Sequence, residues 1–353
     1  MMPLFLIPSP QHGAAGEEGG DRPQQPPQQP HQPTVADVLV VKSMLSKAAT
    51  LPAELINTIT DLAEYWPHTT TEQCYEAQTD GPRIARGGSP ELENLFVLRT
   101  EPLGFPRCPF PQHEAGTIHA EPLPPSGLTP PEWPVEAFQK LIPSAMPMLA
   151  HPCRKIVFTI KAADQGWSSR RSPDDFPYDE SWTWFEAGLE RIGRTAVPND
   201  NGATPPEPAT ETSTQQSQSA IDTSDASGRR PTVPTFRKEY LATILPEVRQ
   251  VQEPQGPKNV FNFEILPRED LTIQRNVGAE KNPRIRKVVW HYTDALSPNS
   301  EELRRIGRGR DTGTGEFVRN LKLGDIVTVW AMARFPAWAN YIFRVRVEVY
   351  WAI

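Results

Sequence analysis

The stretch YIFRVRVEVYW, residues 341–351, decides the fold class of this chain. Every second residue in it is apolar, and the residues between are mostly charged. The apolar set is Phe343, Val345, Val347, Val349 and Trp351, and the charged set is Arg344, Arg346 and Glu348. A period of two is that of a β-strand with one face on a core and the other in water. We therefore expect a half-buried strand here, with Phe343 and the rest of the apolar set facing inward.

Similar patterns occur upstream, at 154–162, 181–192, 258–266, 271–277, 286–293 and 325–335. Turn-forming segments separate several of them, at the spacing of an all-β sandwich. A parallel sheet would need helices between its strands, and no helical pattern of useful length lies there. We predict a mainly β fold: an antiparallel, jelly-roll-like β-sandwich over 151–353, with a short N-terminal helical segment and long disordered regions.

An insertion at 195–235 interrupts this domain. It contains no aromatic residue and is dominated by Ser, Thr, Pro, Gln and Asp, which predicts disorder. The two strands before it are too few to form a stable sheet alone. We therefore expect them to pair with strands after 258, because the entropy of closing a loop grows only slowly with its length.

The N-terminal part divides into three segments. Residues 1–33 are rich in Pro and Gln and are predicted to be a disordered tail. Residues 34–67 show the three- and four-residue apolar spacing of helices, with Thr50 as a candidate N-cap and Pro67 as a stop. Residues 68–150 are predicted to be a Pro-rich connector that packs on the domain, with one strand-like patch at 92–105 and a short helix at 134–149.

Composition limits the classes of protein. The chain has 353 residues, 40 of them proline, and a formal net charge of −7. This charge disfavours a broad nucleic-acid surface. Three widely spaced cysteines, Cys74, Cys108 and Cys153, favour a reducing compartment. No apolar run approaches the ~18 residues of a membrane span. We expect a cytoplasmic or nuclear protein that does not enter a membrane.

No motif predicts catalysis, a metal site or a cofactor. His291 lies in a predicted strand with no second His or Cys nearby, and no GxSxG occurs. We expect a protein that is not an enzyme, although a hydrolase with an unrecognised site remains a third alternative.

The glycine-rich segment RRIGRGRDTGTGEF, residues 304–317, carries a cluster of basic residues. They are Arg304, Arg305, Arg308 and Arg310. The segment matches neither common phosphate-loop motif. It is either a flexible loop with solvated charges or a site for an anion or an acidic partner, because guanidinium groups suit carboxylate and phosphate.

Two tryptophans, Trp167 and Trp338, lie in predicted loops, whereas most others lie in predicted strands, where core packing is expected. Loop tryptophans at one end of a sandwich are candidates for ligand contact. A sugar or peptide would stack on the ring and take hydrogen bonds from Asp164, Gln165 or Asn340.

Two resemblances add to these expectations. LPAELINTITDLAEYW, residues 51–66, resembles the opening of an F-box, which implies that Leu51, Pro52, Leu55 and Ile59 dock on the adaptor protein of a cullin ligase. The C-terminal half, marked by RKIVFTIKAADQGW, TWFEAGLER and LKLGDIVTVWAMARFPAWAN, is similar to galactose-binding-like jelly rolls, to F-box-associated sandwiches and to β-sandwich modules of uncharacterised fungal proteins.

Two functions follow as expectations. The first is an F-box-type substrate adaptor with the sandwich as its recognition module. The second is a stand-alone carbohydrate- or peptide-binding sandwich whose helical segment is only structural. Exposure of Leu55 and Ile59 would favour the first, and burial of both would favour the second.

Overall fold

The computed structural model describes residues 32–76, 81–106, 120–126, 149, 151–167, 176–193, 241–298 and 300–353. Most of the predicted tail, nearly all of the predicted helix at 134–149, the insertion at 195–235 and Cys108 lie outside the described residues. Within the described residues, no helix is long and apolar enough to cross a membrane.

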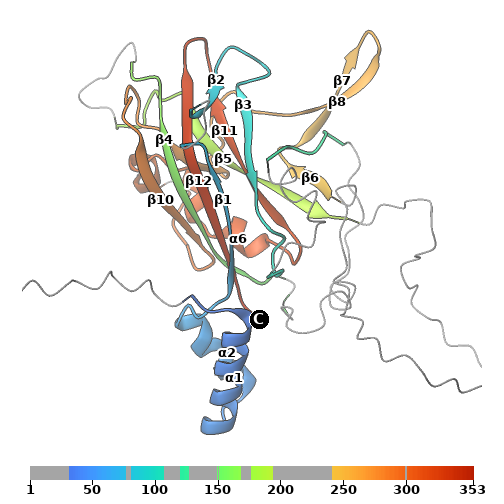
Figure 1. The fold of residues 1–353 in the computed structure, drawn as a ribbon, viewed down its shortest axis with the longest axis vertical. Helices are drawn as coiled ribbons and strands as arrows, with labels where there is room; N and C mark the ends of the chain where they lie inside the picture. The colour runs from blue at the N-terminus through green and yellow to red at the C-terminus, as the bar shows by residue number, and fades with distance from the viewer. Residues whose placement is uncertain are drawn as a thin grey trace, which may run out of the picture. The chain divides into compact units, whose positions relative to one another are not determined.

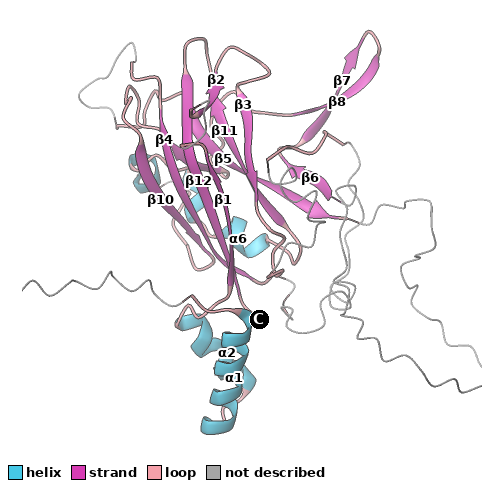
Figure 2. Ribbon diagram, viewed as in Figure 1, coloured by secondary structure: helices cyan, strands magenta, loops and turns pink. Residues whose placement is uncertain are grey.

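Two antiparallel sheets face each other, so the predicted β-sandwich is confirmed (Figures 1 and 2). The first contains β1 (His68–Cys74), β12 (Ala339–Trp351), β4 (Cys153–Ala163) and β10 (Arg284–His291), and β2 (Arg83–Arg86) also pairs with β12. The second contains β3 (Asn94–Arg99), β11 (Ile326–Ala333), β5 (Thr183–Ile192) and β6 (Leu241–Leu245), and β9 (Thr272–Arg275) also pairs with β5.

The main core lies between the sheets. Its members alternate along the regular stretches of the strands, as the side chains of a pleated strand do. Examples are Ile156, Phe158 and Ile160 on β4, and Val345, Val347, Val349 and Trp351 on β12. A smaller cluster covers the outer face of the second sheet, where Phe261 and Phe263 pack on Trp330 with ring centroids 5.5 and 5.2 Å away.

The predicted strand at 341–351 is β12, but the expected inward position of Phe343 is wrong. Ile342 opposes Ala162 on β4, and Arg344 opposes the preceding residue of β4, Lys161. Phe343 is therefore the extra residue of a β-bulge, which reverses the alternation at this point. Ile342 takes the core position, and Phe343 is half-buried with the Lys161 ammonium 6.0 Å from its ring.

The strands on the two sides of the insertion belong to the same sandwich. β4 pairs with β10 and β12, and β5 pairs with β6, β9 and β11, as expected. Ile192 at the end of β5 opposes Leu241 at the start of β6. The insertion therefore leaves and re-enters the second sheet at neighbouring strands.

Two expectations about segment roles differ from the structure. The segment predicted to be a connector supplies β1 and β2, which lie along β12, and β3, which pairs with β11. The sandwich strands therefore begin at His68 and not near residue 151. The predicted strand at 258–266 is mainly β8 (Gly256–Phe261), which pairs with β7 (Val248–Glu253) in a separate hairpin.

The helices gather in two places. α1 (Val35–Ala49) and α2 (Ala53–Leu62) lie beside the C-terminus (Figure 1), and Lys42 of α1 donates a hydrogen bond to the carbonyl of Ile353. α5 (Glu301–Arg305), a 3-10 turn at Arg310–Gly313 and α6 (Glu316–Asn320) join β10 to β11. The glycine-rich segment is thus largely built into short helices, although a flexible loop was one of the two expectations for it.

Candidate functional site

The first candidate surface is one side of α2. Ile56 and Thr60 are buried, whereas Leu55, Ile59 and Leu62 are 50%, 41% and 82% exposed. Positions i, i+4 and i+7 lie one above another on a helix, so these three side chains form a continuous apolar stripe. We call Leu55, Ile59 and Leu62 the α2 stripe.

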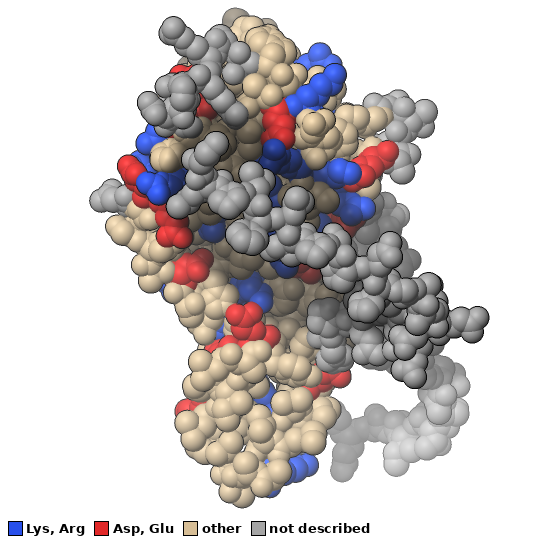
Figure 3. Space-filling view, turned by 90° about the vertical axis from the view of Figure 1, so that its left-hand side faces the viewer, with Lys and Arg blue, Asp and Glu red and all other residues tan. Residues whose placement is uncertain are grey.

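α1 also exposes apolar side chains. Val38 is buried, but Leu39, Val40 and Met44 are exposed. Val40 and Met44, four residues apart, lie on one side of the helix and Leu39 lies beside it, so α1 is apolar on more than its buried side. Figure 3 shows that the part of the molecule formed by these helices carries few charged side chains on the face in view. An exposed helix normally presents polar residues to water, so this apolar surface is a candidate interface.

The sandwich fixes the direction in which the α2 stripe points. Trp66, just beyond α2, is buried, and its indole N–H donates to Asp61 at 2.8 Å. Asp61 also pairs with Arg154 of β4 at 3.3 Å. Glu64 accepts a hydrogen bond from Lys155, and this bond holds the pKa of Glu64 below its usual range. One end of α2 is therefore tied to β4, and the α2 stripe remains exposed.

The predicted docking residues divide between exposed and half-buried positions. Leu55 and Ile59 are exposed, Pro52 is exposed and occupies the N-cap position of α2, and Leu51 is half-buried. The predicted cap, Thr50, instead ends α1 in the left-handed region, with φ at 49°. Sequence reasoning did not include Leu62 among the docking residues, although it follows Leu55 and Ile59 in the same helical period.

The helix that follows the LPAEL sequence is short. α2 ends at Leu62, and the chain enters β1 at His68. The helical surface at this end of the molecule therefore consists of α2 together with α1, which precedes LPAEL.

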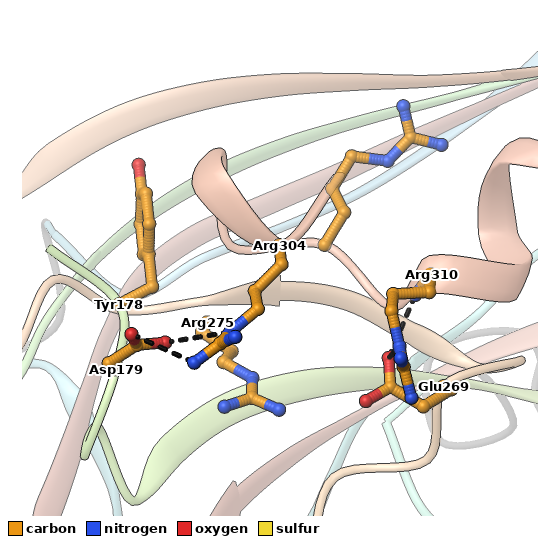
Figure 4. A pocket seen from close by; sticks show the side chains of 7 residues that line it. Tyr178, Asp179, Glu269, Arg275, Arg304 and Arg310 are labelled. Atoms are coloured by element: carbon orange, nitrogen blue, oxygen red, sulfur yellow. Dashed lines mark hydrogen bonds and ion pairs between the residues drawn. The ribbon is translucent and has the colours of Figure 1, made fainter. Parts of the chain in front are cut away.

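The second candidate is a pocket of about 230 Å³ beside the glycine-rich segment, which we call the arginine pocket. Its lining residues come from three separate parts of the chain: Tyr178, Asp179, Glu269, Arg275, Arg304, Arg308 and Arg310. Figure 4 shows Arg275 between the Arg304–Asp179 pair and the Arg310–Glu269 pair.

The backbone explains why these segments meet. Gly307 accepts a hydrogen bond from the Arg275 amide, and Gly309 donates one to Thr272, so the glycine-rich segment runs beside β9. Gly307 has φ at +76°, and a Cβ on it would lie 2.4 Å from the Tyr178 ring. Only glycine satisfies both the left-handed backbone and this close approach.

The charges of the arginine pocket do not balance. Asp179 accepts two hydrogen bonds from Arg304, at 3.2 and 3.1 Å, and Glu269 lies 3.6 Å from the Arg310 guanidinium. Four guanidinium groups face two carboxylates, so the lining carries a formal excess of two positive charges. Burial lowers the pKa of Arg275 and of Arg308, because it removes water from their charged groups.

A more apolar pocket of about 280 Å³ adjoins the arginine pocket and shares Glu269 and Arg275 with it. Trp182, Leu266 and Pro267 provide its apolar lining. The Trp182 ring packs edge-on against Phe335 at 4.6 Å, and Leu266 is 60% exposed.

The structure brings together three of the four arginines predicted to bind an anion. Arg304, Arg308 and Arg310 line the arginine pocket, whereas Arg305 is exposed and lies 3.7 Å from Glu301. Sequence reasoning missed Tyr178, Asp179, Glu269 and Arg275. They lie far from residues 304–317 along the chain, and contacts of β9 and the loops beside it bring them there.

The predicted tryptophan site has little free hydrogen-bonding capacity. Asp164 and Asn340 are buried; Asp164 accepts from the amides of Gly166 and Ala279, and Asn340 donates to the carbonyls of Trp184 and Met332. Gln165 bonds the carbonyl of Trp167 and the amide of Ala339. These side chains hold the loops together.

The two tryptophans of this site differ in exposure. Trp167 is 55% exposed, whereas Trp338 is half-buried. The structure therefore leaves Trp167 with an accessible ring, while the polar groups expected to assist it are engaged within the protein.

The part of the chain that the structure describes holds no group of three or more His, Cys, Asp or Glu side chains arranged for a metal ion. No protein-family model matches the chain, and neither does a curated protein or a solved structure.

Proposed function

We propose that this protein is a non-enzymatic adaptor of the F-box type. In this proposal, α1 and α2 dock in the helical groove of a cullin-ligase adaptor protein, and the β-sandwich recognises a second partner. The observation that carries the proposal is the exposure of Leu55, Ile59 and Leu62 along one side of α2. An amphipathic helix fills an apolar groove with residues at these spacings.

The energetics of the α2 stripe support a docking role. Covering an exposed leucine gains about 2 kcal/mol, so removing the three residues from water would contribute several kcal/mol to a complex. The contacts of Asp61 and Glu64 with β4 hold α2 in place before any partner arrives. Binding then costs little ordering entropy, because the surface is preorganised.

The test is a calorimetric titration of the purified chain with the purified adaptor protein. We expect a 1:1 complex with the wild type and at least a tenfold loss of affinity in Leu55→Asp. The matched control is Ile285→Asp, at an exposed apolar residue on β10, and this variant should bind as the wild type does. Absence of a complex with the wild type, or an equal loss of affinity in both variants, would contradict the proposal.

A second candidate function is carbohydrate binding, and the accessible ring of Trp167 favours it. A glycan array probed with the wild type and with Trp167→Ala tests this function. Signal that disappears in the variant supports a sugar-binding loop, and a blank array with folded protein rejects it.

A further inference from the structure

The arginine pocket contains two guanidinium groups that form no ion pair with a carboxylate of the described residues. Arg304 pairs with Asp179, and Arg310 pairs with Glu269. Within the described part of the chain, the Arg275 side chain forms no hydrogen bond or ion pair, although Glu269 and Asp179 interact with its charge electrostatically at longer range. Holding an uncompensated cation in a partly buried position costs free energy that a bound anion would recover.

Arg308 is the second of these groups. Its Nη2 donates to the carbonyl of Thr312 at 3.2 Å, and its Nε is buried without a partner among the described residues. Asp294 acts on its charge from a distance but forms no ion pair with it. A carbonyl cannot neutralise a guanidinium charge. The excess of two positive charges therefore belongs to Arg275 and Arg308, and a phosphate monoester, which carries about −1.5 to −2 at neutral pH, matches it.

The neighbouring apolar pocket adds a second requirement. Because Arg275 and Glu269 line both pockets, a group bound at Arg275 lies directly beside Trp182 and Leu266. Free phosphate would leave this apolar lining in water. An aromatic or apolar group on the ester oxygen would cover it, whereas a nucleobase would bring polar edges into a lining that is mostly apolar.

We propose that the two pockets form one site for a phosphate monoester whose ester oxygen carries an aromatic or apolar group. Arg275 binds the phosphate, assisted by the charge of Arg308, while Asp179 and Glu269 fix the positions of Arg304 and Arg310. Trp182, Leu266 and Pro267 take the apolar group. The site is independent of the α2 stripe, so it stands or falls separately from the adaptor proposal.

The ligand titration uses the full chain at neutral pH with three probes: inorganic phosphate, phenyl phosphate and phenol. We expect inorganic phosphate to bind weakly, phenyl phosphate to bind about tenfold more tightly and phenol to give no signal, because the ring adds apolar burial only when the phosphate is anchored. Phenyl phosphate that binds no more tightly than inorganic phosphate would overturn the role of the apolar pocket. No binding of either phosphate would overturn the site.

Three variants test the arginine pocket and the neighbouring apolar pocket separately. Arg275→Gln should lose at least tenfold in affinity for both phosphates. Leu266→Ser should lose only the advantage of phenyl phosphate. The matched control is Arg284→Gln. Arg284 is exposed at the start of β10 and pairs with Glu280, so this variant should bind as the wild type does. Equal losses in Arg284→Gln and Arg275→Gln would mean general attraction of anions and would overturn the assignment.

Two more measurements check the folding of the Arg275→Gln variant and identify the molecule that supplies the phosphate ester. If thermal melting shows that Arg275→Gln is unfolded, Arg310→Gln replaces it. That variant leaves Glu269 without its cation and should also weaken the binding of both phosphates.

A phosphotyrosine peptide and phenyl phosphate carry the same chemistry. Tighter binding of the peptide identifies a protein source, and equal binding identifies a small molecule. Affinity for both should fall below pH ~6, where the phosphate gains a proton while arginine stays charged.

Discussion

At the scale of single residues, the burial of the Glu186 carboxyl makes the free energy of unfolding depend on pH. It accepts hydrogen bonds from the Trp184 indole at 2.8 Å and from the Arg268 amide at 3.1 Å. Burial nevertheless raises the pKa of Glu186, and these hydrogen bonds only partly oppose the shift. The folded state therefore holds this proton more tightly than the unfolded state does.

The sign of the pH effect follows. As pH rises from the ordinary Glu pKa of ~4.3 towards the raised value in the folded state, Glu186 lowers the free energy of unfolding. Glu186→Gln cannot titrate, so its stability relative to the wild type should increase across this window. Urea denaturation of both proteins between pH 4 and pH 7 measures the difference. A difference that stays constant with pH would contradict the assignment.

Sequence patterns do not determine the exposure of single residues. Leu55 and Ile56 are both apolar residues within one helical period, yet one is half exposed and the other is buried. Which of them faces the sandwich depends on the contact of Asp61 with β4 and that of Trp66 with β10, and these elements lie far from α2 in the sequence.

At the scale of elements, period-two strands were predictable and polar strands were not. β12 and β4 alternate clearly because one face of each covers the core. β1, with the sequence HTTTEQC, has β12 as its single strand partner among the described residues and buries little, so its sequence lacks the alternation that marks a strand. The bulge at Phe343 was also hidden, because an inserted residue shifts the register without leaving a pattern.

α2 gives a prediction at this scale, since its two sides should respond oppositely to substitution. Ile56→Ala should lower the free energy of unfolding by about 2–4 kcal/mol, because it leaves a cavity under the helix. Leu62→Lys should change it by less than about 0.5 kcal/mol, because Leu62 is in water and a cation suits the end of a helix. Urea denaturation checks both. A large loss in Leu62→Lys would mean that the α2 stripe is part of the fold and not an interface.

At the scale of the whole molecule, the sequence predicted that two early strands join later ones across the insertion. It could not predict the arginine pocket, because Arg275, Asp179 and the glycine-rich segment meet only once β9 and the loops beside it are in place. Short motifs are visible along a chain, whereas a pocket built from three segments depends on the assembled sheets.

The insertion provides a prediction at this scale. Ile192 and Leu241 are neighbours across β5 and β6, so a short link can replace the chain between them. Reducing that loop to about a sixth of its length should raise the free energy of unfolding by about 1.5 kcal/mol, since less loop entropy is lost on folding. Thermal melting of the shortened chain tests this. A markedly lower Tm would mean that the insertion contributes to the folded structure.

The central claim is that the α2 stripe is the surface on which a helical partner docks. Hydrogen exchange of the chain, measured alone and with saturating cullin-ligase adaptor protein, tests it most directly because it locates the contact. We predict slower exchange of amides in residues 35–62, with unchanged rates in β4, β5 and β11. Unchanged exchange in residues 35–62 at saturating adaptor would contradict the claim.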